Sequence, residues 1–324
     1  MSEIDILAAR EVPLGGLRAM LVRRTLPSRA RSMIGAWCFV DHYGPNPVTP
    51  STGMRVPPHP HTGLQTVSWL FSGEIVHRDS VGSLAAIRPG ELNIMTAGRG
   101  ISHSEVSTPE TTVLHGVQLW LALPDEARGM APFFESHVAV RSTVGPATLQ
   151  VFAGTINGSS ATVTTFTRIV GAQLDLPAGA RVTLTVDPRD EHGVLVDCGS
   201  VLLEGSPVAA TELAFVPQGS AQLTITAGEE DARLIIIGGE PFTEKIVMWW
   251  NFVGRSHEDI VATRAAWQAE ALGIGPGLGM GTLAEEAYFP SAQQHVDDTG
   301  TGHDYEGAPL PAPEMPMVRL KPRR

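Results

Sequence analysis

The sequence is poor in the features that mark membrane, exported and nucleic-acid-binding proteins. Its 324 residues include only two cysteines, Cys38 and Cys198, which are too few and too far apart for a disulfide framework. No apolar run approaches the ~20 residues that a membrane-spanning helix needs. Lys and Arg number 23 against 34 Asp and Glu, a net charge of −11. This excess of acid disfavours contact with nucleic-acid phosphates or with anionic lipid surfaces.

The first residues, MSEIDILAAREV, lack the basic stretch and apolar core of a secretory signal. We therefore expect a cytoplasmic protein with reduced thiols, no direct nucleic-acid partner and no membrane partner. The chain is longer than the ~250–300 residues at which single hydrophobic cores stop growing, so two domains are expected.

Short strands are expected through most of the chain. Glycine (34 residues) and proline (25 residues) recur at short intervals. Between them lie runs rich in Val, Ile, Leu, Thr and Trp, a pattern typical of antiparallel sandwiches and barrels. The sequence therefore predicts an all-β protein built from antiparallel β-barrels. The clearest runs are residues 66–71, 73–79, 113–123, 181–186, 193–205, 221–228 and 232–239.

The stretch 124–137, PDEARGMAPFFESH, interrupts the rhythm of strands and turns. It has the character of a linker or a short crossover, and the strand pattern resumes after it. We therefore expect one domain over residues 1–140 and a second over residues 141–255.

A helix and a tail are expected after the second domain. Ser256 with Asp259 forms a short version of a capping box, and apolar residues follow at near-helical spacing. Gly273 stands where a C-cap would, so the helix is predicted over 256–273. Residues 274–324 are rich in Gly, Pro and Asp, which predicts an extended tail that can lie over the domains.

A weak internal repeat favours two related barrels. Residues 91–105, ELNIMTAGRGISHSE, align without gaps with residues 212–226, ELAFVPQGSAQLTIT. Residues 59–69 align more loosely with residues 190–200. Each aligned pair is expected to be the same strand region in two barrels of one type.

Two short motifs carry the chemistry. PPHPHTG contains His59 and His61, and GRGISHSE contains His103 and Glu105. Side chains at i and i+2 of a β-strand point to one face, so each pair can project into a barrel interior. If the two strands are neighbours, three imidazoles and a carboxylate converge, which suits a divalent first-row transition metal. An isolated His-x-His is more often a surface or core pair, and the second motif is what favours a metal site.

These motifs resemble the pirin family. GMRVPPHPHTG fits the first cupin motif, in which a glycine and five further residues precede His-x-His. PHPHTGLQTVSWLFSGEIVHRDS, PGELNIMTAGRGISHSE and HGVQLWLALP are similar to pirin sequences, as are WCFVDHYGP and GGEPFTEKIV. The resemblance implies a bicupin, with two β-barrel domains facing each other and a metal in the N-terminal barrel. It implies His59, His61, His103 and Glu105 as ligands of Fe(II), with Mn, Ni, Cu and Zn as alternatives.

One position departs from the cupin motif. The motif has a glutamate four residues after the second histidine, where this chain has Gln65. That position is not a metal ligand in pirins, so we expect the metal site to persist. Gln65 cannot titrate, which leaves Glu105 or a group of the substrate to accept a proton. Glu105 is therefore the candidate catalytic residue, and Gln65 is expected to do no more than hold substrate or water.

Other side chains are weaker candidates. His77 and Asp79 share a strand face and could orient a ligand histidine, but a polar pair at a strand end is the preferred interpretation. His115 and Gln118 face opposite sides of a strand, so at most one of them reaches the pocket. His42 is expected to be a packed structural histidine. Core positions are expected for the tryptophans Trp69, Trp120, Trp249 and Trp250.

The second barrel is expected to lack a metal. In the gapless repeat, Thr224 and Thr226 stand where the first barrel has its second ligand pair. In the looser alignment, Asp190 and His192 remain at the first pair, and two ligands without partners make a poor site.

Two functions from different classes remain open. Three histidines and a glutamate leave room on an octahedral metal for a small aromatic substrate and O2, and the resemblance implies a quercetin 2,3-dioxygenase-like activity on flavonol, catechol or enol substrates. Other pirins are regulators that bind transcription factors or metabolic enzymes, which implies a protein partner. Both functions need the same four ligands. A sugar-isomerase-type cupin has no support beyond fold analogy.

Overall fold

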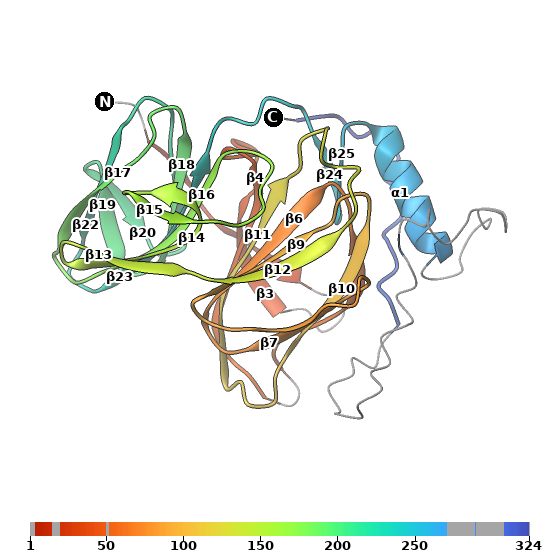
Figure 1. Ribbon diagram of the computed structural model, residues 1–324, viewed down its shortest axis with the longest axis horizontal. Coiled ribbons are helices and arrows are strands. Elements are labelled where there is room, and N and C mark those ends of the chain that lie inside the picture. The colour runs from red at the N-terminus through yellow and green to blue at the C-terminus, as the bar shows by residue number, and fades with distance from the viewer. Residues whose placement is uncertain (1–3, 15–19, 50–51, 271–288, 290–307, 324) are drawn as a thin grey trace.

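The computed structural model describes residues 4–14, 20–49, 52–270, 289 and 308–323. In these ranges the chain forms 25 strands and one α-helix, which confirms the all-β class. The strands build two lobes side by side, and helix α1 (His257–Glu270) lies on the outer side of the lobe that contains β6, β9 and β10 (Figure 1).

The first lobe contains a seven-stranded and a four-stranded antiparallel sheet. In spatial order the larger sheet comprises β12 (Phe133–Val138), β9 (Glu91–Thr96), β6 (Leu64–Ser72), β11 (Val113–Ala122), β4 (Trp37–Pro47), β3 (Met20–Leu26) and β2 (Arg10–Leu14). The smaller sheet comprises β5 (Arg55–His61), β10 (Ile101–Ser107), β7 (Ile75–Asp79) and β8 (Leu84–Ile87).

The second lobe repeats this arrangement. Its larger sheet comprises β1 (Asp5–Leu7), β21 (Leu213–Val216), β18 (Glu191–Cys198), β23 (Ala232–Gly239), β16 (Ile169–Leu176), β14 (Ala147–Ile156) and β13 (Val140–Val144), with β15 (Ser159–Ala161) paired to β14. Its smaller sheet comprises β17 (Arg181–Thr185), β22 (Gln222–Ala227), β19 (Ser200–Leu203) and β20 (Ser206–Ala209).

The strand orders of the two lobes correspond position by position. The gapless repeat of residues 91–105 and 212–226 aligns β9 with β21 and β10 with β22. These strands occupy equivalent positions in the strand orders of the two lobes. Strand β1 precedes the first lobe along the chain but pairs with β21 at the edge of the second lobe's large sheet. Strand β12 lies between the two lobes along the chain and pairs with β9 at the edge of the first lobe's large sheet. Strand β1 therefore crosses from the N-terminal end of the chain to the second lobe, whereas β12 pairs within the first lobe. A domain boundary near residue 140 falls between β12 and β13 and remains our proposal.

The lobes are not the closed barrels that the sequence analysis expected. In each lobe the large and small sheets are separate hydrogen-bonded paths within the described residues. Alternating short strands are compatible with both arrangements, because the inward and outward faces alternate in the same way. The interior of the second lobe is filled by apolar side chains, among them Val182, Leu184, Leu223 and Ile225.

The outer faces of the two large sheets pack against each other. Trp69 of β6 shares one buried cluster with Phe152 of β14 and Leu195 of β18, and its Nε1 donates a hydrogen bond to Gln173 Oε1 at 2.8 Å. The face of the first lobe's large sheet that points away from the second lobe is therefore available to form a site.

The helix begins as the capping pattern predicted. The Asp259 N–H donates to Ser256 Oγ at 3.1 Å. Gly273, the predicted C-cap, lies outside the described residues, as does most of the tail. Between the second lobe and the helix, a hairpin of β24 (Val247–Trp249) and β25 (Phe252–Gly254) returns to the first lobe. No helix among the described residues is long and apolar enough to cross a membrane.

Candidate metal centre

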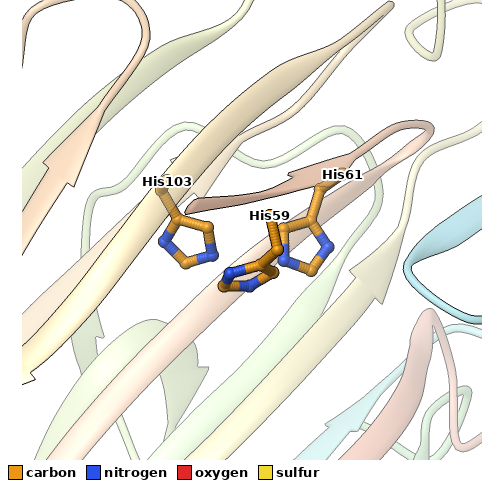
Figure 2. Close-up of side chains that lie close together, drawn as sticks. All are labelled: His59, His61 and His103. Carbon is orange, nitrogen blue, oxygen red and sulfur yellow. The ribbon is translucent and has the colours of Figure 1, made fainter. Parts of the chain in front are cut away.

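Strands β5 and β10 are antiparallel neighbours, as the ligand hypothesis requires. His103 lies opposite His59, and Ile101 lies opposite His61. Figure 2 shows the imidazole rings of His59, His61 and His103 gathered at one place, with ring centroids 4.4 to 5.0 Å apart. One ring nitrogen from each histidine can be chosen so that all three lie within 4.8 Å of one another. A single ion between them could reach all three.

Two glycines allow the loops beside the histidines to meet. Gly63 follows His-Thr with φ of +68°, and a Cβ there would lie 2.1 Å from the Val253 carbonyl oxygen. Gly98 is the first residue of the second motif and has a φ of +51°, and a Cβ there would lie 2.2 Å from the Met130 carbonyl oxygen. The Gly63 N–H donates to the Gly98 carbonyl at 2.8 Å. At neither position can a side chain be added without shifting the backbone that lies against it.

The three histidines are buried and neutral. Burial lowers the pKa of His59 to about 4 and holds the pKa values of His61 and His103 well below the ordinary range. His59 Nδ1 lies 2.9 Å from the Pro57 carbonyl oxygen, so this nitrogen carries the proton and Nε2 keeps its lone pair. His61 Nδ1 and His103 Nε2 are buried with no hydrogen-bond partner. Neutral imidazoles with unused nitrogens are what a metal ion requires.

A hydrogen-bonded chain lies behind His103. Asp79 Oδ1 accepts backbone hydrogen bonds from Val81 and Ser83 at 3.0 and 2.9 Å, and Asp79 Oδ2 lies 3.1 Å from His77 Nε2. His77 Nδ1 in turn lies 3.3 Å from His103 Nδ1. Burial acts to raise the pKa of Asp79, but the hydrogen bonds from His77 and Ser83 outweigh it and lower the pKa.

The hydrogen bonds from Asp79 through His77 fix the tautomer of His103. An ionised Asp79 keeps a proton on Nε2 of His77, so Nδ1 of His77 accepts a hydrogen bond from Nδ1 of His103. The lone pair of His103 then sits on Nε2, the atom that has no other partner. The preferred sequence interpretation of His77 and Asp79 as a polar pair at a strand end is therefore corrected: they orient a candidate ligand.

Glu105 lies beside the histidines on β10. Its carboxylate is within 4.8 Å of ring nitrogens of His77 and His103. The Ser68 hydroxyl lies 3.2 Å from Glu105 Oε1 and 2.9 Å from Gln118 Oε1. Burial raises the pKa of Glu105, which makes its carboxylate a stronger base than an exposed one. The single hydroxyl proton of Ser68 serves one of these oxygens at a time.

All four candidate ligands line one cavity of about 490 Å³. Phe39 and Trp120 line it as a stacked pair, with ring centroids 3.9 Å apart and planes within 10°. Trp249 and Trp250, from the hairpin, line it as well. Of the tryptophans expected in the core, Trp69 and Trp120 are buried there, and Trp120 also borders the cavity. Trp249 and Trp250 are half-buried and line the cavity instead. These rings suit a flat aromatic ligand.

Gln65 does not take part in the cavity. Its Nε2 donates to Thr96 Oγ1 and to the Thr164 carbonyl oxygen, both at 2.9 Å. Side chains alternate along β6, so Ser68 faces the candidate ligands and Gln65 faces the second lobe. The expectation that Gln65 holds substrate or water is wrong, because this amide links the two lobes instead.

A second buried cluster lies between the lobes. His115 Nε2 and His42 Nε2 lie 2.6 and 2.7 Å from Asp197 Oδ1, and Arg233 Nη1 donates to Asp197 Oδ2 at 3.2 Å. Burial opposes ionisation of Asp197, but the bonds from the two histidines lower its pKa. Both Nε2 protons and a guanidinium therefore satisfy this carboxylate, which identifies a structural link between the lobes. Of the pair His115 and Gln118, only Gln118 borders the cavity.

The second lobe places different residues at the equivalent positions. The strand that pairs with β22 is β17, and Thr183 lies opposite Thr224. Asp190 and His192 lie at the start of β18 instead, so the looser of the two repeat alignments was wrong. Asp190 forms an ion pair with Arg168 at 2.6 Å.

Two similar lobes of antiparallel sheets, each with a small sheet facing a large one, define a bicupin protein. The family follows from sequence comparison. The Pirin family model matches residues 19–121, and the model of the Pirin C-terminal cupin domain matches residues 171–273. The chain belongs to the pirin family, which confirms the resemblance seen in its motifs.

Similar proteins agree with this assignment. The chain is 42% identical over 265 residues to a Pseudomonas aeruginosa protein named "Putative quercetin 2,3-dioxygenase", covering 81% of this chain and 82% of that protein. It is 33% identical over 279 residues to a "Pirin-like protein" of Caulobacter vibrioides, covering 82% and 92%.

Solved structures show the same fold. A crystal structure of quercetin 2,3-dioxygenase from Acinetobacter baumannii matches with a TM-score of 0.84 at 33% identity, over 98% of this chain and 97% of that chain. A bacterial pirin from Escherichia coli in complex with nickel(II) matches with a TM-score of 0.59 at 19% identity, over 74% and 100%. The second likeness concerns the fold alone.

Proposed function

We propose that this pirin is a metal-dependent dioxygenase that acts on a flavonol or a related aromatic substrate with adjacent oxygen atoms. The observation that carries the proposal is a cavity that combines buried imidazoles, two of them with unpartnered nitrogens, a buried carboxylate and aromatic walls. The names of the Pseudomonas aeruginosa and Acinetobacter baumannii proteins support the same reaction class.

The metal would be held by His59, His61, His103 and Glu105. Three imidazoles and a carboxylate suit a divalent first-row metal, and we propose Fe(II), with Mn, Ni, Cu and Zn as alternatives. When bound, the metal would supply a Lewis acid that favours the deprotonated form of a substrate hydroxyl group. The one carboxylate leaves a formal charge of +1 on a divalent centre, which also favours an anionic substrate oxygen.

Glu105 would accept the proton from the substrate hydroxyl group. Its burial strengthens it as a base, and Ser68 holds Oε1 at 3.2 Å. The stacked Phe39 and Trp120 would orient the substrate rings beside the candidate ligands. O2 is the oxidant, and both of its atoms enter the products.

The test is O2 uptake together with the loss of flavonol absorbance. Iron-reconstituted protein is compared with metal-free protein and with free Fe(II) over a panel of flavonols. We expect the reconstituted protein to exceed the free ion for at least one flavonol. If it is no faster than free Fe(II) across the panel, the dioxygenase proposal fails. The alternative, a metal- or redox-dependent regulator that binds transcription factors or metabolic enzymes, then takes its place.

A further inference from the structure

A segment outside both family matches forms part of the cavity wall. The C-terminal family match ends at residue 273, and the structure describes residues 308–323 beyond it. Leu310 and Pro311 of this segment line the same cavity as the four candidate metal ligands. The wall beside the proposed metal centre is therefore completed by a part of the chain that the family models do not cover.

The backbone of Leu310 is fixed from two sides. Its N–H donates to the Pro58 carbonyl oxygen at 2.8 Å, and Pro58 directly precedes the candidate ligand His59 on β5. Its own carbonyl oxygen accepts a hydrogen bond from Trp267 Nε1 of α1, also at 2.8 Å. Two residues on, the Ala312 N–H donates to Gln268 Oε1 of the same helix at 2.9 Å. Leu310 is thus held between the ligand strand and the helix.

The segment is stiff as well as anchored. Prolines at positions 309, 311 and 313 fix φ on both sides of Leu310. The carbonyl oxygen of Pro313 accepts a hydrogen bond from Arg264 Nε at 2.6 Å. Ala312 is buried in a cluster with Trp267 and Phe289. A rigid segment of this kind sets a fixed cavity width rather than acting as a movable cover.

We propose that Leu310 and Pro311 are specificity-determining residues that limit the width of the substrate cavity. They admit a flat flavonol and exclude one that carries a bulky substituent on its rings. The substrate class rests on the proposed function. The steric role of Leu310 rests on the anchored backbone, which keeps its position when the side chain is changed.

The test measures ligand binding without turnover. Full-length protein is loaded with redox-inert Zn(II), and the fluorescence of Trp120, Trp249 and Trp250 reports ligand entry, because these rings line the cavity. The probes are quercetin and its 7-O-glucoside, which share the hydroxyl and carbonyl oxygens of the flavonol ring and differ in bulk. Leu310→Ala and Leu310→Trp are compared with Met317→Ala, a control in the same segment whose side chain is fully exposed.

We expect Leu310→Ala to lower the Kd of the glucoside about tenfold, because the smaller side chain removes the steric conflict with the sugar. The Kd of quercetin should rise slightly, because the flat ring system loses a contact. Leu310→Trp should raise the Kd of quercetin, and Met317→Ala should change neither value. The volume-conserving Leu310→Met should behave as the wild type, which separates width from loss of folding.

Equal changes of both Kd values in Leu310→Ala, or no change in either, would overturn the inference. So would the absence of quercetin binding to the wild-type protein. Failure of the proposed function gives a different result, because the Kd pattern with zinc needs no turnover. If Leu310→Ala changes the selectivity of binding but the wild-type protein shows no flavonol-dependent O2 uptake, the dioxygenase proposal fails. The inference that Leu310 limits the width of the cavity then still stands.

Discussion

The chain of hydrogen bonds behind His103 can be tested by replacing His77 with phenylalanine. A phenyl ring keeps the flat shape that stacks on Phe134 at 4.6 Å, but it removes the acceptor that lies 3.3 Å from His103 Nδ1. The His103 Nδ1 proton then has no acceptor in a buried place, and the tautomer that leaves Nε2 free is no longer favoured.

The expected effect on metal affinity is 10- to 100-fold, the size typical of losing a partner of a metal-binding histidine. This corresponds to about 1.4–2.8 kcal/mol and agrees with the ~1–3 kcal/mol cost of a buried donor left without an acceptor. His77→Gln retains an acceptor oxygen and should recover part of the affinity. His137→Phe is the matched control, because that histidine lies on β12 outside the cavity.

The assay is a competition titration of Zn(II) against a chromophoric chelator, with the melting temperature of each metal-free variant measured alongside. Lowered affinity in His77→Phe beyond that of His137→Phe supports the account. The reasoning is refuted if His77→Phe binds Zn(II) within twofold of the wild type, or if His77→Gln is as weak as His77→Phe.

Three further predictions follow from buried charge. Glu105→Gln should reduce flavonol turnover far more than metal occupancy, measured by O2 uptake beside metal analysis; equal losses would make Glu105 only a ligand. Burial lowers the pKa of His59 to about 4 from 6.5, so the unfolded chain protonates first as the pH falls. The metal-free protein should lose roughly 3 kcal/mol from this group between those values, and a melting temperature unchanged from pH 7 to 4 would contradict it. Asp197→Asn should cost about 3–5 kcal/mol in denaturant unfolding, whereas Asp187→Asn, which breaks an ion pair with the exposed Arg189, should cost much less; similar costs would refute the link.

The sequence singled out the candidate ligands through strand periodicity and through the resemblance of both motifs to the pirin family. The i, i+2 spacing of His59 with His61 and of His103 with Glu105 fixes which face each pair shares. Bringing the two pairs together also requires that β5 and β10 be neighbours, and the structure shows this pairing. The repeat found at residues 91–105 likewise located the equivalent strands of the second lobe.

Other features depend on register and on long-range contacts. The role of His77 depends on the register of β7 on β10, in which His77 lies opposite Glu105 and Asp79 opposite His103. No pattern within β7 encodes that register. Gln65 was expected to hold substrate or water because it occupies the glutamate position of the cupin motif. The turn at Gly63 separates β5 from β6, so the face of Gln65 cannot be counted from the histidines. The walls formed by the tryptophans of the hairpin and by Leu310 come from segments far along the chain.

The central claim, a single metal centre in the first lobe, is tested most directly by metal analysis of reconstituted variants. Wild-type protein, His103→Ala and His192→Ala are loaded with Fe(II) without oxygen, desalted and measured for iron per chain. His192 is the matched control, since it is a buried histidine of the second lobe whose Nε2 also has no partner. The account predicts one iron per chain in the wild type and in His192→Ala, and loss of most iron in His103→Ala. Full occupancy in His103→Ala, or equal losses in both variants, would contradict it.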